Sequence, residues 1–172
     1  MSAIIRKRIK SEISGIKWNA PAHIPSFKEY RISGPLLKAK YEHLGVELPF
    51  PIFDHWYYHT DVTGWASIVR NLVISSSLYK PDKRDCDFYA RKAKTMCEEL
   101  YELNTMVESY GRTPRGPHMF DSFFDGDVIW LFEPNEGFED ERGTWQDLWG
   151  YLDGDLIFPW GANEYICTHV LL

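Results

Sequence analysis

Three residues of the types used in nucleophilic catalysis occur in an order that suits one site. Cys86 begins a predicted helix, His118 opens a predicted strand, and Glu133 ends the next strand. In such a triad the imidazole takes the thiol proton and later protonates the leaving group, while the carboxylate orients the ring and stabilises the imidazolium. The residue types and their order therefore predict a cysteine hydrolase or acyltransferase that works through a thioester.

The nucleophile is expected in the first turn of an amphipathic helix that runs from residue 86 to about residue 104. Pro81 disfavours helix in the loop before it, and after Asp85 the apolar residues follow a period of about 3.6. Asp85 is predicted as the N-cap. The unpaired N–H groups and the helix dipole at this end favour a thiolate.

The base and its orienting acid are expected at the open end of a β-hairpin over residues 118–133. Its Asp125-Gly126 dipeptide suits a two-residue type I′ turn. In the register set by this turn, His118 lies directly opposite Glu133, and opposed residues have Cβ atoms about 5 Å apart. The hairpin thus predicts a carboxylate beside the imidazole, and a slip of one residue would separate them.

The other elements predict an α+β fold, in which a central helix bearing Cys86 packs on an antiparallel sheet. Asp61 is predicted as the N-cap of the first helix of this body. The pattern indicates a strand over 53–60, a helix over 61–72, loops over 75–84 and 110–117, a helical turn over 145–152 and a final strand over 164–172.

The motifs around the three residues resemble those of the papain-like and transglutaminase-like cysteine peptidases. Asp85-Cys86-Asp87-Phe88-Tyr89-Ala90 is similar to the signature of bacterial transglutaminase-like cysteine peptidases and to the papain-like protease domain of fungal agglutinins. Small phage-encoded relatives share motifs that match Tyr79–Asp87, Gly116-Pro117-His118 and Glu133-Pro134. The resemblance covers residues 53–172.

The resemblance implies a papain/transglutaminase-like fold and a protein or peptide substrate. It also implies that Cys86 is the nucleophile, His118 the base and Glu133 the orienting acid. No residue of this chain matches the family's oxyanion-hole side chain, although the amide of Cys86 suits one donor. Relatives of the agglutinin type bind calcium, which leaves a calcium site open here, with no residue assigned and no other cofactor expected.

Two further functions stay open on the sequence alone. One is a phage or bacterial interaction protein that keeps the scaffold without turnover. The other is a peptidoglycan amidase of the NlpC/P60 type, whose Asp-Cys-Ser-Gly-Phe motif differs from this chain at Asp87-Phe88.

Length and composition fit a folded protein of a reducing compartment. The 172 residues suffice for a buried core, and no apolar run approaches the roughly 18 residues of a membrane span. No signal-peptide pattern follows the basic N-terminus, so the cytoplasm is expected, that of a host cell if a phage encodes the chain. Cys97 and Cys167, without short-spaced partners, are interpreted as small buried hydrophobes.

The charge is distributed unevenly along the chain. Residues 1–40 hold nine basic and two acidic residues, whereas residues 41–172 hold ten and twenty-three, for a net charge of −6. Residues 1–50 are therefore predicted to form a basic arm with short helices beside a peptidase-like domain over 51–172. The arm is expected to contact the acidic body or another copy of the chain, and no motif indicates nucleic acid.

Two residue groups invite a metal but do not fit one well. His55 and His59 alternate on a predicted strand, which is more typical of an exposed aromatic edge than of zinc. Asp121, Asp125 and Asp127 suggest calcium, but Phe residues stand where the EF-hand spacing needs ligands.

Overall fold

The computed structural model describes residues 24–113, 116–136, 157–159 and 165–172. The helical turn predicted at 145–152 lies outside these residues. The elements in chain order are β1 (Glu29–Ser33), α2 (Gly34–His43), β2 (Trp56–Thr60), α3 (Val62–Ile68), η1 (Val69–Leu72), η2 (Ser76–Leu78), α4 (Cys86–Tyr101), β3 (Val107–Thr113), β4 (Gly116–Phe124), β5 (Ile129–Phe132), β6 (Ile157–Pro159) and β7 (Ile166–Leu171).

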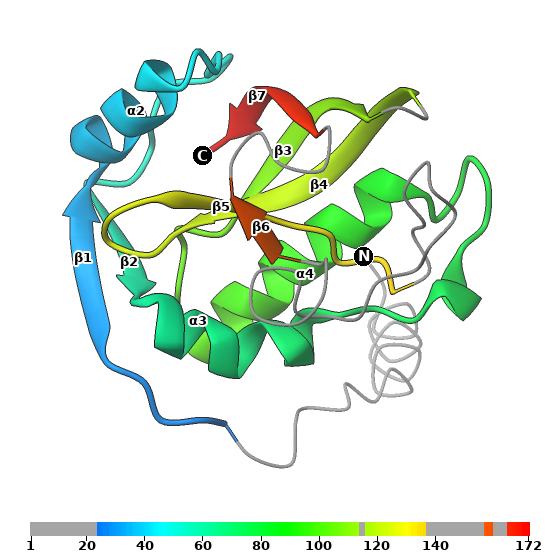
Figure 1. Cartoon of the computed structure of the whole chain (residues 1–172), viewed down its shortest axis with the longest axis horizontal. Helices are drawn as coiled ribbons and strands as arrows, with labels where there is room; N and C mark the ends of the chain where they lie inside the picture. Colours follow the sequence, from blue (N-terminus) through cyan, green and yellow to red (C-terminus); the bar gives the residue numbers. More distant parts are fainter. Residues whose placement is uncertain (1–23, 114–115, 137–156, 160–164) are drawn as a thin grey trace, which may run out of the picture.

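The main sheet is antiparallel, with the strand order β6-β5-β4-β3-β7. Helix α4 crosses one face of it and packs against β4 and β3, as Figure 1 shows. This confirms the predicted α+β fold, with the cysteine-bearing helix on an antiparallel sheet. The core between these layers is rich in aromatic residues, including Trp65, Tyr89, Phe123, Trp130 and Phe132.

Helix α4 follows the predicted stripe, since Tyr89, Ala93 and Cys97 are buried against the sheet. It ends earlier than predicted, at Tyr101, because Glu102 adopts a left-handed conformation with φ of 57°. Asp85 occupies the N-cap position, but its side chain makes no capping hydrogen bond. Its carboxyl group instead hydrogen-bonds to that of Asp87, which raises the pKa of Asp85.

The predicted register of the β4–β5 hairpin is wrong by two residues. Phe124 pairs with Ile129 rather than with Asp127. The cause is Asp125, whose Oδ1 accepts the N–H groups of Asp127 and Val128, each at 2.8 Å. The tip therefore moves one residue along the chain, with Gly126 at a φ of 106°. A shift of two keeps the alternation of side chains, so residues predicted to share a face still do.

The loop predicted over 110–117 is wrong, because Val107–Thr113 forms β3 in the middle of the sheet. Gly111 had indicated a loop, but it lies inside β3, where the absence of a side chain is required. A Cβ atom added there would lie 1.9 Å from the carbonyl oxygen of Ile166. Glycine thus lets β7 pass close to β3, where the register between the two strands shifts.

Residues that the sequence analysis placed in the N-terminal arm contact the rest of the domain. Strand β1 pairs with β2 in a second, two-stranded sheet. The side chains of Leu37 and Tyr41 on α2 are fully buried, and the Tyr41 hydroxyl lies 2.9 Å from Ser122 Oγ on β4. Helix α3 begins as predicted, since Asp61 Oδ1 accepts the N–H of Gly64 at 2.9 Å.

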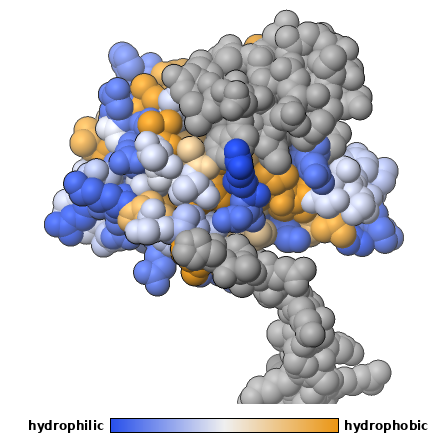
Figure 2. Space-filling view, turned by 60° about the horizontal axis from the view of Figure 1, so that its bottom comes forward, coloured by the Kyte–Doolittle hydropathy of each residue, from blue (hydrophilic) through white to orange (hydrophobic). Residues whose placement is uncertain are grey.

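The surface mixes hydrophilic and hydrophobic residues, and Figure 2 shows apolar areas lying between polar ones. Large exposed apolar side chains include Phe50, Phe53 and Ile166. Within the part of the chain that the structure describes, none of the helices combines the length and the hydropathy of a membrane span.

Candidate active site

The structure brings Cys86, His118 and Glu133 together in one hydrogen-bonded series. His118 Nε2 donates to Glu133 Oε2 across 2.6 Å. Because Nε2 is engaged there, Nδ1 is the ring nitrogen left for the hydrogen bond between the imidazole and the Cys86 thiol. The contact predicted from the sequence thus exists, although the two strand residues are not directly opposed.

The start of α4 meets the start of β4 at this point. Cys86 is the first residue of α4, and its sulfur also accepts the backbone N–H of Met119. His118 is buried, whereas Cys86 is half-buried. The thiol is therefore reachable from solvent while the imidazole behind it is enclosed.

Both carboxylate oxygens of Glu133 accept hydrogen bonds besides the one from His118. The backbone N–H of Asn135 donates to Oε1 at 3.0 Å, and the hydroxyl of Tyr165 donates to Oε2 at 3.1 Å. A buried carboxylate with this many donors is held in one orientation. Glu133 can therefore fix the ring of His118.

The loop before α4 ties the helix to the segment that carries Glu133. The N–H of Ile74 donates to the carbonyl of Pro134 at 2.8 Å, and the N–H of Glu136 donates to the carbonyl of Ile74 at 3.1 Å. The Tyr89 hydroxyl on α4 donates to the neighbouring carbonyl of Ser75 at 3.0 Å. These contacts hold the nucleophile and the acid on one framework.

The electrostatics of the site favour a charged pair. The hydrogen bond from His118 lowers the pKa of the Cys86 thiol, although burial and Asp85 oppose this shift. Burial disfavours the imidazolium, but the Glu133 charge and the hydrogen bonds to Cys86 and Glu133 prevail and raise the pKa of His118 to about 9. A thiolate beside an imidazolium is the reactive form of a catalytic cysteine.

Sequence reasoning missed three contributors to this site, namely the N–H groups of Met119 and Asn135 and the hydroxyl of Tyr165. Backbone donors have no residue-type signal. Tyr165 was expected within the last strand and directly precedes it, but no local pattern indicates that it reaches Glu133, thirty-two residues earlier in the chain.

The histidines of the first aromatic strand do not converge on a metal. His59 is buried and stacks on Tyr30, with 5.6 Å between the ring centroids. His55 precedes β2, and its ring contacts Trp56 edge-on at 4.9 Å. Among the described residues, no group of three or more His, Cys, Asp or Glu side chains could hold a metal ion.

The three aspartates considered for calcium lie in different environments and make different contacts. Asp125 Oδ2 accepts the indole N–H of Trp130 at 2.7 Å, in addition to the turn contacts of Oδ1. Asp127 is exposed at the hairpin tip, whereas Asp121 is fully buried on β4. The three carboxyl groups thus have different surroundings.

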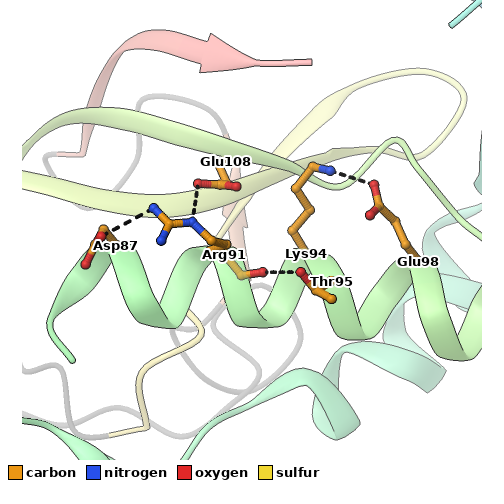
Figure 3. A network of polar contacts seen from close by, with 6 residues as sticks. All are labelled: Asp87, Arg91, Lys94, Thr95, Glu98 and Glu108. Atoms are coloured by element: carbon orange, nitrogen blue, oxygen red, sulfur yellow. Dashed lines mark hydrogen bonds and ion pairs between the residues drawn. The ribbon is translucent and has the colours of Figure 1, made fainter. Parts of the chain in front are cut away.

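Asp121 lies between β4 and α4 in an environment that disfavours its charge. Neither carboxyl oxygen has a hydrogen-bond partner among the residues that the structure describes. Glu108 is its neighbour on β3, and the basic groups of α4 are engaged elsewhere. Figure 3 shows Arg91 between Asp87 and Glu108, and Lys94 with Glu98. Burial raises the pKa of Asp121 well above its usual range.

In the unaltered protein, the Asp121 carboxyl group is expected to reduce the stability of the fold at neutral and alkaline pH. Replacing Asp121 with asparagine should remove this effect. The folded protein holds a proton on Asp121 where the unfolded chain, with a pKa of about 3.9, has released it. Stability therefore falls as pH rises from that value towards the folded pKa. Urea unfolding at several pH values measures this fall, which should be smaller in D121N and unchanged in the exposed-site control D127N. Equal pH dependence in D121N and the unaltered protein would contradict the assignment.

Comparison with known proteins identifies the fold. No protein-family model and no curated protein matches the sequence. A solved structure, the complex of PSL1a with E64, is similar with a TM-score of 0.55 and 16% sequence identity. The match covers 83% of this chain and 51% of that one, so this chain spans about half the length of PSL1a, a papain-like cysteine protease. The likeness shows that this chain has a papain-like fold.

Proposed function

We propose that this protein is a cysteine hydrolase or acyltransferase that acts on amide bonds of a peptide or protein substrate. The observation that supports the proposal is the hydrogen-bonded series Cys86–His118–Glu133, with a half-buried thiol at the start of α4. A papain-like fold alone is compatible with many functions. The pairing of a thiol of lowered pKa with an enclosed, oriented imidazole favours catalysis over a purely structural role.

In the proposed reaction the Cys86 thiolate attacks the carbonyl carbon, and a C–S bond forms. The carbonyl oxygen becomes an oxyanion, for which the N–H of Cys86 is one donor because the first N–H groups of a helix have no partner within it. The tetrahedral intermediate then expels the amine, which takes the proton from His118 Nδ1 as the C–N bond breaks.

The second half of the reaction releases the acyl group. Water, or an acceptor amine in the case of transfer, attacks the thioester while His118 accepts its proton. The C–S bond then breaks, and the thiolate–imidazolium pair is restored. Glu133 keeps its charge throughout, because it stabilises the imidazolium without accepting the proton.

Labelling with E64 tests the nucleophile directly. The inhibitor carries an epoxide that a thiolate opens, and the similar PSL1a structure contains it. We expect one covalent adduct per chain, and peptide mapping by mass spectrometry should place it on Cys86. The other thiols are internal controls, because burial raises the pKa of Cys97 and raises that of Cys167 to about 12.

Turnover is measured with a mixed library of fluorogenic peptides and with a labelled amine as acceptor. Release of the fluorophore indicates hydrolysis, and incorporation of the amine indicates transfer. If neither occurs, and Cys86 reacts with E64 and iodoacetamide no faster than a free thiol, the proposal is wrong. A scaffold that binds partners without turnover would then be the better interpretation.

A further inference from the structure

We infer that Tyr165 is a positioning residue of this active site, which holds Glu133 in place and encloses its hydrogen bond to His118. The inference rests on the proposed function and adds a fourth side chain to the three predicted from the sequence. The Tyr165 hydroxyl donates to Glu133 Oε2 at 3.1 Å. The same oxygen accepts from His118 Nε2 at 2.6 Å.

The ring of Tyr165 is fixed by aromatic contacts on the face of the sheet that carries His118 and Glu133. It meets Phe120 edge-on, with 5.0 Å between centroids and an interplanar angle of 75°. It meets His118 edge-on as well, at 5.9 Å and 77°. Tyr165 is 5% exposed and belongs to a cluster with Phe120 and Leu131. The hydroxyl is thus aimed at Glu133 by a ring that has little freedom to turn.

The position of Tyr165 depends on how closely β7 approaches β3. Tyr165 immediately precedes β7, and Ile166 pairs with Arg112. Gly111 precedes Arg112 on β3, and a Cβ atom added to it would lie 1.9 Å from the carbonyl oxygen of Ile166. Gly111 is also the residue directly opposite His118 on β4. The close passage of β7 therefore occurs beside the base, and it brings the tyrosine to the acid.

Two consequences follow for the His118–Glu133 pair. The hydroxyl gives Glu133 Oε2 a second donor, which restricts the carboxylate to the plane in which it meets the imidazole. The packed ring also keeps water from that side of the hydrogen bond, and such enclosure strengthens its electrostatic component.

Two substitutions separate the hydroxyl from the ring. Tyr165→Phe removes only the hydroxyl, and we expect kcat to fall about 10-fold with KM changed less than about two-fold. Tyr165→Leu removes the ring as well and should lower kcat by about 100-fold. Tyr41→Phe is the matched control, since it also removes the hydroxyl of a buried tyrosine. The hydroxyl removed in this case is the one that contacts Ser122.

A readout independent of turnover is the His118 Nε2–H proton, observed by NMR. Its exchange with solvent, measured well below the unfolding transition, should be about 10-fold faster or more in Tyr165→Phe and unchanged in Tyr41→Phe. If the unaltered protein lacks turnover and enhanced Cys86 reactivity but the variants show this difference, the proposed function fails and the positioning role stands. If Tyr165→Phe keeps both the kcat and the exchange rate of the unaltered protein, Tyr165 is merely a core residue and the inference is wrong.

Discussion

Replacing Cys86 with alanine is expected to lower kcat/KM by about 10,000-fold or more, because removal of the nucleophile eliminates the covalent route. No other thiol can substitute for it. Cys97 is buried on α4, and Cys167, on the edge strand β7, hydrogen-bonds to the carbonyls of Tyr110 and His169. The assay is hydrolysis of the peptides selected with the unaltered protein, at matched enzyme concentration.

The matched control for this prediction is Cys167→Ser, which removes another partly buried thiol from a different part of the molecule. It should keep activity within about two-fold, and its E64 adduct should remain on Cys86. Circular dichroism and thermal unfolding verify that both variants are folded. Activity of Cys86→Ala above one-tenth of the unaltered level would show that another group performs the chemistry.

Local signals predicted the element that carries the nucleophile. The period of the apolar residues in α4 is a property of the helix itself, and the buried Tyr89, Ala93 and Cys97 follow it. The start of the helix at Cys86 was also readable from Pro81 and Asp85. The capping contact could not be predicted in the same way. Asp87 hydrogen-bonds to the Asp85 carboxyl group, so the N-terminus of α4 has no side-chain cap.

The contact between His118 and Glu133 was predicted through a register that turned out to be wrong. Asp125 accepts two backbone N–H groups and shifts the turn, which moves the pairing by two residues. The two side chains still meet because strand side chains alternate with a period of two. A diagonal pair with a long glutamate side chain can bridge the same gap as a direct one.

The features that could not be predicted from the sequence, strand β3 and the contact of Tyr165 with Glu133, depend on contacts between residues far apart in the chain. Gly111 suggested a loop, yet its small size serves the approach of β7 within the sheet. Strand β3 was therefore missed, although its buried residues Val107, Ser109 and Thr113 alternate with exposed ones. Tyr165 depends on the same approach, so its contact with Glu133 could not be predicted from nearby residues.

Replacing Glu133 with glutamine is expected to lower kcat/KM by about 100- to 10,000-fold. The amide cannot stabilise the imidazolium, and only Cys86 is then left to oppose the effect of burial on His118. The pKa of His118, raised to about 9 in the unaltered protein, should therefore fall in the variant. Titration of the imidazole by NMR measures this change directly.

The pH dependence of activity and stability should change together in Glu133→Gln. In the unaltered protein the imidazolium is lost as pH rises through about 9, so kcat/KM should decline there. The same proton stabilises the fold below pH 6.5, and this contribution of the imidazolium is lost between pH 6.5 and about 9. Urea unfolding across this interval should show a different pH dependence of stability in the unaltered protein and in the variant.

The matched control is Glu136→Gln, which neutralises an exposed carboxylate three residues further along the same segment. It leaves the backbone contact between Glu136 and Ile74 in place, so it tests the effect of charge in this region without touching the triad. It should preserve both the activity and the alkaline decline near pH 9. If Glu133→Gln retained that decline, the proton lost there would belong to a group other than His118, and the thiolate–imidazolium pair would not be the active form.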